Sequence, residues 1–244
     1  MKKRAGAGKT GKGAKRAFTL ALEGATYEGS VALIADSTVI AERTLSPEDG
    51  GIPRMGRGER LMPAVAECLE EGGVERGEIV RIVCGAGPGS FTSLRVAASI
   101  AKGLAAGYGV DLFAVPSLLL TVTGAKPALA PGEYLSVLDA MRGEFFAARV
   151  LLHPGGSGVQ IEPTTILSAG QLREAAARDR AVRVIGPGQE NDARPHARGV
   201  AGVLSSIVGG GAGPVDLASW EPDYGRLAEA QVRWEAAHGR PLIR

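Results

Sequence analysis

The stretch Cys84–Arg95, with the sequence CGAGPGSFTSLR, has the residue types and spacing that come closest to a reactive site in this chain. It carries three glycines and a proline after a short apolar run, and an apparent helix follows it. Backbone N–H groups at a helix N-terminus attract anions, so Gly87, Gly89 and Ser90 are candidates for holding a phosphate. A serine in such a turn is also a candidate nucleophile.

Two features of the loop argue against both kinds of chemistry. No lysine follows the glycines, although a P-loop needs one to reach the phosphates. Ser90 lacks the flanking glycines of a nucleophile elbow, and the sequence shows no triad partner for it. Ser90 or Thr92 is instead placed to cap the helix, and glycine allows close backbone packing. We therefore predict a structural loop that turns a strand sharply into a helix.

Metal and thiol chemistry have little support in the sequence. The three histidines, His153, His196 and His238, include no pair four residues apart that could grip one ion from a helix face. Cys68 and Cys84 fall on apolar positions of their elements, which predicts buried free thiols. We expect no metal site and no cofactor.

The charge of the chain is unevenly distributed. The first 17 residues carry seven basic side chains and no acidic one, whereas the remaining residues carry 21 basic and 26 acidic side chains. This composition predicts a disordered basic tail at 1–17 ahead of a globular body. We see neither a secretory signal nor an apolar run long enough to span a membrane, so we expect a cytoplasmic protein without membrane contact.

The hydrophobic patterns predict an α/β protein in two similar halves. Expected strands are 18–24, 29–36, 38–45, 78–85, 110–115, 134–140, 144–152 and 181–188, and expected helices are 58–73, 91–107, 116–124, 168–179 and 225–239. The buried face of the second helix is predicted to be small: Leu94, Ala97, Ala98, Ala101, Leu104 and Ala105. Met141-Arg142-Gly143 is typical of a hairpin turn, with Asp139 as a turn stabiliser. Residues 190–225 show no clear pattern.

The run GAGPGSFTSLRVAASIAKGLA closely resembles the G-x-G-P-G-S-F-T-G-x-R signature of the TsaB (YeaZ-like) family of bacterial tRNA-modification subunits. Further similarity lies in GERLMP, VPSLLL, LDAMRGEFFAA and GRLAEAQ. The resemblance implies a two-subdomain actin/hexokinase/Hsp70-like (ASKHA) fold with duplicated α/β halves. In this interpretation residues 18–118 form the N-terminal subdomain, joined by a C-terminal helix at 226–238, and residues 119–225 form the C-terminal subdomain.

The resemblance also implies a function. Members of this family are regarded as non-catalytic dimerisation and scaffold subunits, not enzymes on their own. They pair with the paralogue TsaD, which transfers a threonylcarbamoyl group to N6 of the tRNA adenosine adjoining the anticodon, and the ATPase TsaE joins the pair. We therefore expect TsaD and TsaE as partners, a homodimer when the chain is alone, and tRNA contact only through the complex.

Two helices are implied as the subunit interface, because the corresponding helices form it in the family. The candidate interface residues are Leu61, Met62, Val65, Leu69, Leu94, Arg95, Ala98, Ala101 and Lys102.

The chain departs from ATP-using relatives of the fold at the first hairpin. An acidic residue there positions the metal–phosphate, and the TsaB family commonly has Asp-Thr-Ser; this chain has Glu23 followed by glycine. We predict that Glu23 is a solvated turn carboxylate. The alternative is an ASKHA-type small-molecule kinase or ATPase that binds nucleotide through Glu23, Gly87, Gly89 and Ser90, with residues 184–189 as a second loop.

Overall fold

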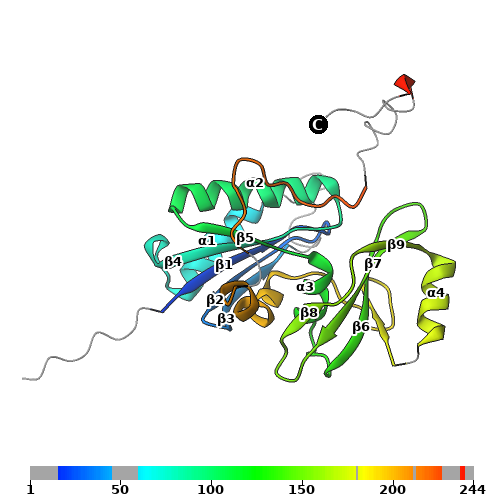
Figure 1. The fold of residues 1–244 in the computed structure, drawn as a ribbon. Coiled ribbons are helices and arrows are strands. Elements are labelled where there is room, and N and C mark those ends of the chain that lie inside the picture. Colours follow the sequence, from blue (N-terminus) through cyan, green and yellow to red (C-terminus); the bar gives the residue numbers. More distant parts are fainter. Residues whose placement is uncertain (1–15, 46–59, 180, 211–212, 227–236, 240–244) are drawn as a thin grey trace, which may run out of the picture.

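The computed structural model describes residues 16–45, 60–179, 181–210, 213–226 and 237–239. These residues form two mixed α/β halves, each built on a five-stranded sheet (Figure 1). The predicted two-sheet α/β architecture is confirmed. Most of the predicted tail at 1–17 and of the predicted helix at 226–238 lies outside the described residues.

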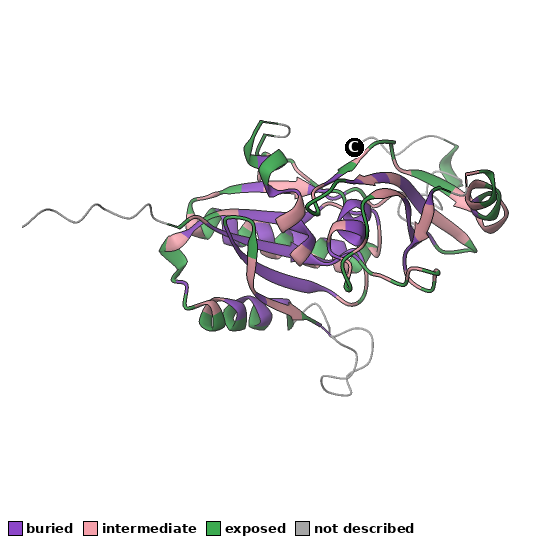
Figure 2. Cartoon of the chain, turned by 90° about the horizontal axis from the view of Figure 1, so that it is seen from below, coloured by how far each residue is buried: buried purple, intermediate pink, exposed green. Residues whose placement is uncertain are grey.

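The first sheet has the order β3-β2-β1-β4-β5. Strands β1 (Phe18–Glu23), β2 (Ser30–Ala35) and β3 (Thr38–Thr44) form the predicted antiparallel meander, and β4 (Ile79–Gly85) and β5 (Asp111–Val115) add in parallel. All residues of β1 and β2 are buried, as expected for strands covered on both faces (Figure 2).

Helices α1 (Leu61–Gly72) and α2 (Phe91–Tyr108) cover one face of this sheet. The six residues predicted for the inner face of α2 are its buried residues, so the small-residue face is confirmed. Helix α1 ends at Gly73, whose φ of 60° is left-handed and favours glycine. Most residues on the outer faces of both helices are exposed.

Helix α3 (Ser117–Thr123) lies between the two sheets (Figure 1). The 3₁₀ segment η3 (Ala197–Gly202) and helix α5 (Leu204–Val208) belong to the same buried cluster, which joins β1, β2 and β4 to the second half. A short 3₁₀ turn, η2 (Arg76–Glu78), precedes β4.

The second sheet has the order β10-β6-β7-β8, and β9 also pairs with β7. Its strands are β6 (Gly132–Asp139), β7 (Glu144–Leu152), β8 (Gly158–Gln160), β9 (Thr165–Ser168) and β10 (Arg183–Ile185). Helix α4 (Ala169–Arg178) starts with a capping box between Ser168 and Gln171. Strands β8 and β9 were not predicted, because three or four residues are too few to show a period.

The β6–β7 hairpin was predicted from its turn. Met141 and Arg142 both have positive φ, of 66° and 60°, and Gly143 follows at 76°. Asp139 Oδ1 accepts a hydrogen bond of 2.7 Å from the Met141 amide, as expected for a turn stabiliser.

The segment 213–224, for which the sequence showed no clear pattern, runs across α2 (Figure 1). The Val215 amide bonds to the Leu112 carbonyl at 2.9 Å, which anchors the segment to β5. Further along, the amino group of Lys102 lies 5.8 Å from the centre of the Trp220 ring. The segment therefore covers part of α2 that would otherwise face solvent.

Candidate functional site

Glu23 ends β1 and is the acidic residue of the first hairpin for which nucleotide binding was considered from the sequence. Its side chain is 1% exposed. Oε1 accepts a 2.5 Å hydrogen bond from the Ala25 amide, and the Ser117 hydroxyl donates to the carboxylate at 3.0–3.1 Å. The prediction of a solvated turn carboxylate is wrong, because the glycine loop and α3 fold over this turn and exclude water from it.

Burial has an electrostatic consequence for Glu23. Desolvation raises its pKa to about 7, although hydrogen bonds from Ala25, Ser117 and Gly24 oppose the rise. Near neutral pH this carboxyl group is therefore close to half protonated. A partly neutral carboxyl group that faces protein on all sides is poorly suited to bind a magnesium–phosphate group.

The glycine loop that follows β4 uses its amides within the chain. The Ala86 amide donates to the Val115 carbonyl at 2.7 Å, and the Ser90 amide donates to the Ala25 carbonyl at 2.7 Å. The Gly87 amide donates to the Ser117 hydroxyl at 3.0 Å. These three N–H groups are not available to a phosphate, which supports the interpretation of the loop as architecture.

Close packing explains why the loop needs glycine. A Cβ atom on Gly85 would overlap the Glu23 carboxylate, and one on Gly89 would overlap the Ala25 backbone. Gly87 has a φ of 89° and packs on the Asp223 carbonyl. Ser90 is the N-cap of α2 as predicted, but its hydroxyl contacts that of Ser93 at 3.0 Å and makes no capping bond to the backbone.

Gly89→Ala is therefore expected to destabilise the protein by about 2 to 3 kcal/mol, because the added methyl group meets rigid backbone. Chemical denaturation measures this loss. Gly103→Ala in α2 is the matched control: nothing lies within 4 Å of its added methyl group, and we expect a gain of about 1 kcal/mol. Equal stability of the two variants would contradict the packing argument.

The second predicted phosphate loop, residues 184–189, is also folded back on itself. The Gly186 amide donates to the Asn191 carbonyl at 3.1 Å, and the Gln189 amide donates to the Gly186 carbonyl at 3.1 Å. It therefore gives the kinase alternative no additional support.

The nine candidate interface residues separate into two groups. Five are buried in the chain's own core, with at most 5% of their surface exposed: Leu61, Val65, Leu94, Ala98 and Ala101. They hold α1 and α2 on the sheet and present no surface to another molecule. Met62 is 45% exposed, Arg95 is exposed, and Leu69 and Lys102 are half-buried. Only these four remain available for a subunit contact.

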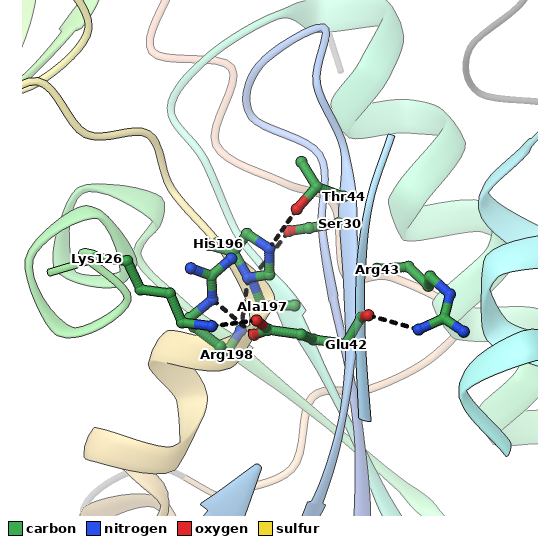
Figure 3. A network of polar contacts seen from close by, with 8 residues as sticks. All are labelled: Ser30, Glu42, Arg43, Thr44, Lys126, His196, Ala197 and Arg198. Atoms are coloured by element: carbon green, nitrogen blue, oxygen red, sulfur yellow. Dashed lines mark hydrogen bonds and ion pairs between the residues drawn. The ribbon is translucent and has the colours of Figure 1, made fainter. Parts of the chain in front are cut away.

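A polar network around His196 was missed by the sequence analysis, since a lone histidine in a segment without pattern gives no signal. The His196 Nδ1 accepts the Arg198 amide at 3.1 Å, and Nε2 lies 2.9 Å from the Thr44 hydroxyl (Figure 3). Because Nδ1 is an acceptor, the neutral ring carries its proton on Nε2 and donates to Thr44. The adjacent Ala197 amide donates to Ser30 at 3.0 Å.

Glu42 is the charged centre of the same network. It pairs with Arg198 at 2.7 Å and with Lys126, which precedes the second sheet (Figure 3). Burial alone would raise its pKa, but the bond from Lys126 and the charge of Arg198 lower it below the usual value. Burial, with the charge of Arg198, lowers the pKa of His196 to about 3. The network thus joins β3 to η3 with a histidine that stays neutral.

The two cysteines are buried and free, as predicted. Burial raises the pKa of the Cys68 thiol to about 11, so it is protonated at neutral pH.

Within the described ranges, no cluster of three or more His, Cys, Asp or Glu side chains could hold a metal ion. Nor does any helix in that part of the chain have the length and apolar character to cross a membrane.

Fold and site together define a two-subdomain ASKHA-like α/β protein. The two loops that were candidates for binding nucleotide make hydrogen bonds within the chain. A family model described as "TsaD: tRNA N6-adenosine threonylcarbamoyltransferase" matches residues 35–155. The chain is similar to TsaB/YeaZ proteins, as the following comparisons show.

The chain is 34% identical over 129 residues to "tRNA threonylcarbamoyladenosine biosynthesis protein TsaB" of Escherichia coli (strain K12), a match that covers 53% of each protein. It is 26% identical to the protein of the same name from Bacillus subtilis (strain 168), over 88% of this chain and 96% of that protein. The alignment thus spans about half of the first relative and nearly all of the second.

A solved structure is also similar, described as an uncharacterized protein with similarity to peptidase YEAZ from Pseudomonas aeruginosa. The TM-score is 0.72 at 25% identity, covering 86% of this chain and 100% of the other. The predicted ASKHA-like fold is therefore confirmed.

Proposed function

We propose that this chain acts in threonylcarbamoyladenosine biosynthesis as a non-catalytic subunit in the cytoplasm. In this role it pairs with a TsaD paralogue and organises that protein and TsaE, while the partner transfers the threonylcarbamoyl group to tRNA. The observation that carries the proposal is the similarity to the TsaB proteins, which reaches along nearly the whole Bacillus subtilis protein.

The site geometry supports a role without nucleotide chemistry. The Glu23 carboxylate is enclosed by Ala25 and Ser117, and the glycine-loop amides donate to acceptors of the same chain. A surface role requires exposed side chains, and α1 and α2 present Met62 and Arg95 next to the half-buried Leu69 and Lys102. We propose these four residues as part of the contact with the partner subunit.

An omission assay tests the function. Transcribed tRNA is incubated with threonine, bicarbonate, ATP and the partner proteins of the same organism, with or without this chain, and the modified nucleoside is quantified. We expect product formation to fall at least tenfold when this chain is omitted. Unchanged product would contradict the subunit role, and saturable binding of Mg-ATP to this chain would then favour the kinase alternative.

The contact surface has its own test in Met62→Glu. A new carboxylate in the contact would have to be desolvated on association, so we expect at least tenfold weaker binding to the TsaD partner in a calorimetric titration. Its melting temperature is expected to stay unchanged because Met62 is 45% exposed.

Val208→Glu is the matched control for Met62→Glu. Val208 is 55% exposed and ends α5, whose buried residues pack with the opposite face of the sheet from α1 and α2. We expect this variant to bind the partner like the wild type. Equal weakening by both substitutions, or by neither, would contradict the assignment of α1 to the contact.

A further inference from the structure

A cavity of about 570 Å³ lies where the two halves of the molecule meet. One wall comes from the turn after β1 and the N-terminus of α2. The other wall comes from the end of β6, the hairpin turn and β7. The segment that ends at Arg226 contributes Tyr224 to the lining. A volume of this size is ordinary for a small-molecule site, which is typically about 300–1,000 Å³. None of the four residues proposed for the subunit contact lines this cavity.

The lining is mainly apolar and aromatic. Three large side chains on it are substantially exposed: Tyr27 at 52%, Phe91 at 40% and Met141 at 65%. The Phe91 and Tyr224 rings lie 4.5 Å apart at an angle of 47°. The Arg95 guanidinium also lies 5.0 Å from the centre of the Phe91 ring. Exposed aromatic side chains on a cavity wall, such as Tyr27 and Phe91, offer stacking surfaces to a flat ring.

A few polar groups add direction to this apolar surface. The Arg226 guanidinium pairs with Glu144, but its Nε–H is buried and has no acceptor within the described ranges. A buried donor without a partner is costly, and a turn of the Arg226 side chain, which is 29% exposed, would bring this donor to a ligand oxygen and remove that cost. The exposed carboxylate of Asp139 and the hydroxyl groups of Ser90 and Thr92 also line the cavity.

The charges argue against a phosphate in this cavity. The positive charge of Arg226 is matched by Glu144, and Asp139 adds a negative charge to the wall. The neighbouring amides of Gly87 and Ser90 already donate within the chain. An anionic ligand would meet a carboxylate and few open donors.

We propose that this cavity binds a small uncharged ligand with a flat aromatic ring and a carbonyl-type acceptor. The ring stacks against Tyr27, Phe91 or Tyr224, and the acceptor takes the Arg226 Nε–H. This site is independent of the proposed subunit role, so either can fail without the other.

A ligand-observed NMR titration with 2-quinolone, a flat uncharged ring system with one carbonyl group, tests the proposal on the full chain. We expect saturable binding to one site with a dissociation constant of about 1 mM or below, in line with the affinity of ligands of this size. Thr92→Trp, which adds bulk at the exposed rim, is expected to weaken binding at least tenfold. Ser99→Trp, on the exposed face of α2 and outside the lining, should bind as the wild type does.

Arg226→Lys tests the hydrogen bond separately. Lysine keeps a positive charge for Glu144 but has no N–H at the Nε position, so we expect several-fold weaker binding of 2-quinolone. Binding of naphthalene, which has the same ring size and no hydrogen-bond acceptor, should change by less than twofold. These results would support the donor assignment.

Three outcomes would overturn the proposal. The first is the absence of saturable 2-quinolone binding up to its solubility limit. The second is binding that Thr92→Trp leaves unchanged, which places the ligand elsewhere. The third is tighter binding of Mg-ATP than of 2-quinolone with mutual displacement, which would assign the cavity to a phosphate-bearing ligand.

Discussion

Acidification is expected to cost this protein about 3 kcal/mol of folding stability between pH 7.5 and pH 4 through His196 alone. The buried ring has a pKa of about 3 in the folded chain against an ordinary value of 6.5. Below pH 6.5 the histidine of the unfolded state therefore binds a proton, whereas the histidine of the folded state does not. Folding stability is lost as pH falls below 6.5. The loss amounts to about 4 kcal/mol at pH 3 and approaches about 5 kcal/mol at lower pH.

His196→Asn isolates this contribution. Asparagine can still accept the Arg198 amide as an N-cap residue, but it does not titrate. We expect the variant to be less stable than the wild type at pH 7.5, because the bond to Thr44 is lost and a cavity remains. The difference should shrink by about 3 kcal/mol, or change sign, at pH 4.

Denaturant unfolding at several pH values measures both proteins. The test uses the difference between the two proteins, because the contributions of the groups that both proteins share largely cancel. A difference that does not vary between pH 7.5 and pH 4 would mean that the pKa of His196 in the folded chain equals its ordinary value. The described network would then be wrong.

The second large effect has the opposite sign and comes from Glu23. Its pKa is about 7 in the folded chain and 4.5 in a solvated carboxyl group. The folded state holds the proton more tightly, so this stability is present below pH 4.5 and is lost as pH rises through 7. The loss between pH 4 and pH 8 is about 3 kcal/mol.

Glu23→Gln should remove this dependence. The amide has nearly the same shape and can still accept the Ala25 amide hydrogen bond, but it carries no charge at any pH. We expect the variant to gain about 3 kcal/mol relative to the wild type between pH 4 and pH 8, whatever its offset at pH 4.

Glu23→Ala serves as the comparison. It also removes the charge, but it leaves the Ala25 amide and the Ser117 hydroxyl without their acceptor and opens a cavity beside Gly85. We expect it to be less stable than Glu23→Gln at every pH by about 2 to 4 kcal/mol. A pH-independent difference between Glu23→Gln and the wild type would show that Glu23 is solvated after all.

Both effects have the same origin in the fold. His196 and Glu23 lie where segments far apart in the sequence enclose a polar side chain: β3 with η3 in one case, and β1 with α3 in the other. Their opposite pH dependences predict greatest stability between about pH 4.5 and pH 6.5, as far as these two groups are concerned.

The sequence by itself determined the features that depend on local period and local conformation. The small face of α2 follows from helical spacing, and the glycine loop and the hairpin at Met141–Gly143 follow from turn chemistry. The burial of Cys68 and Cys84 follows from their apolar positions. In each case the residues that decide the structure lie within a few positions of one another.

Only the tertiary structure decided which polar groups are enclosed and which surfaces stay open. Glu23 was predicted to be solvated, yet Ser117, 94 residues away, closes over it. Leu61 and Val65 were candidates for the interface, but helix spacing alone cannot show whether an apolar stripe faces the sheet or a partner. Likewise, Thr44 and His196 are 152 residues apart in the sequence. The periodic pattern of a single helix or strand cannot predict a contact between residues that far apart.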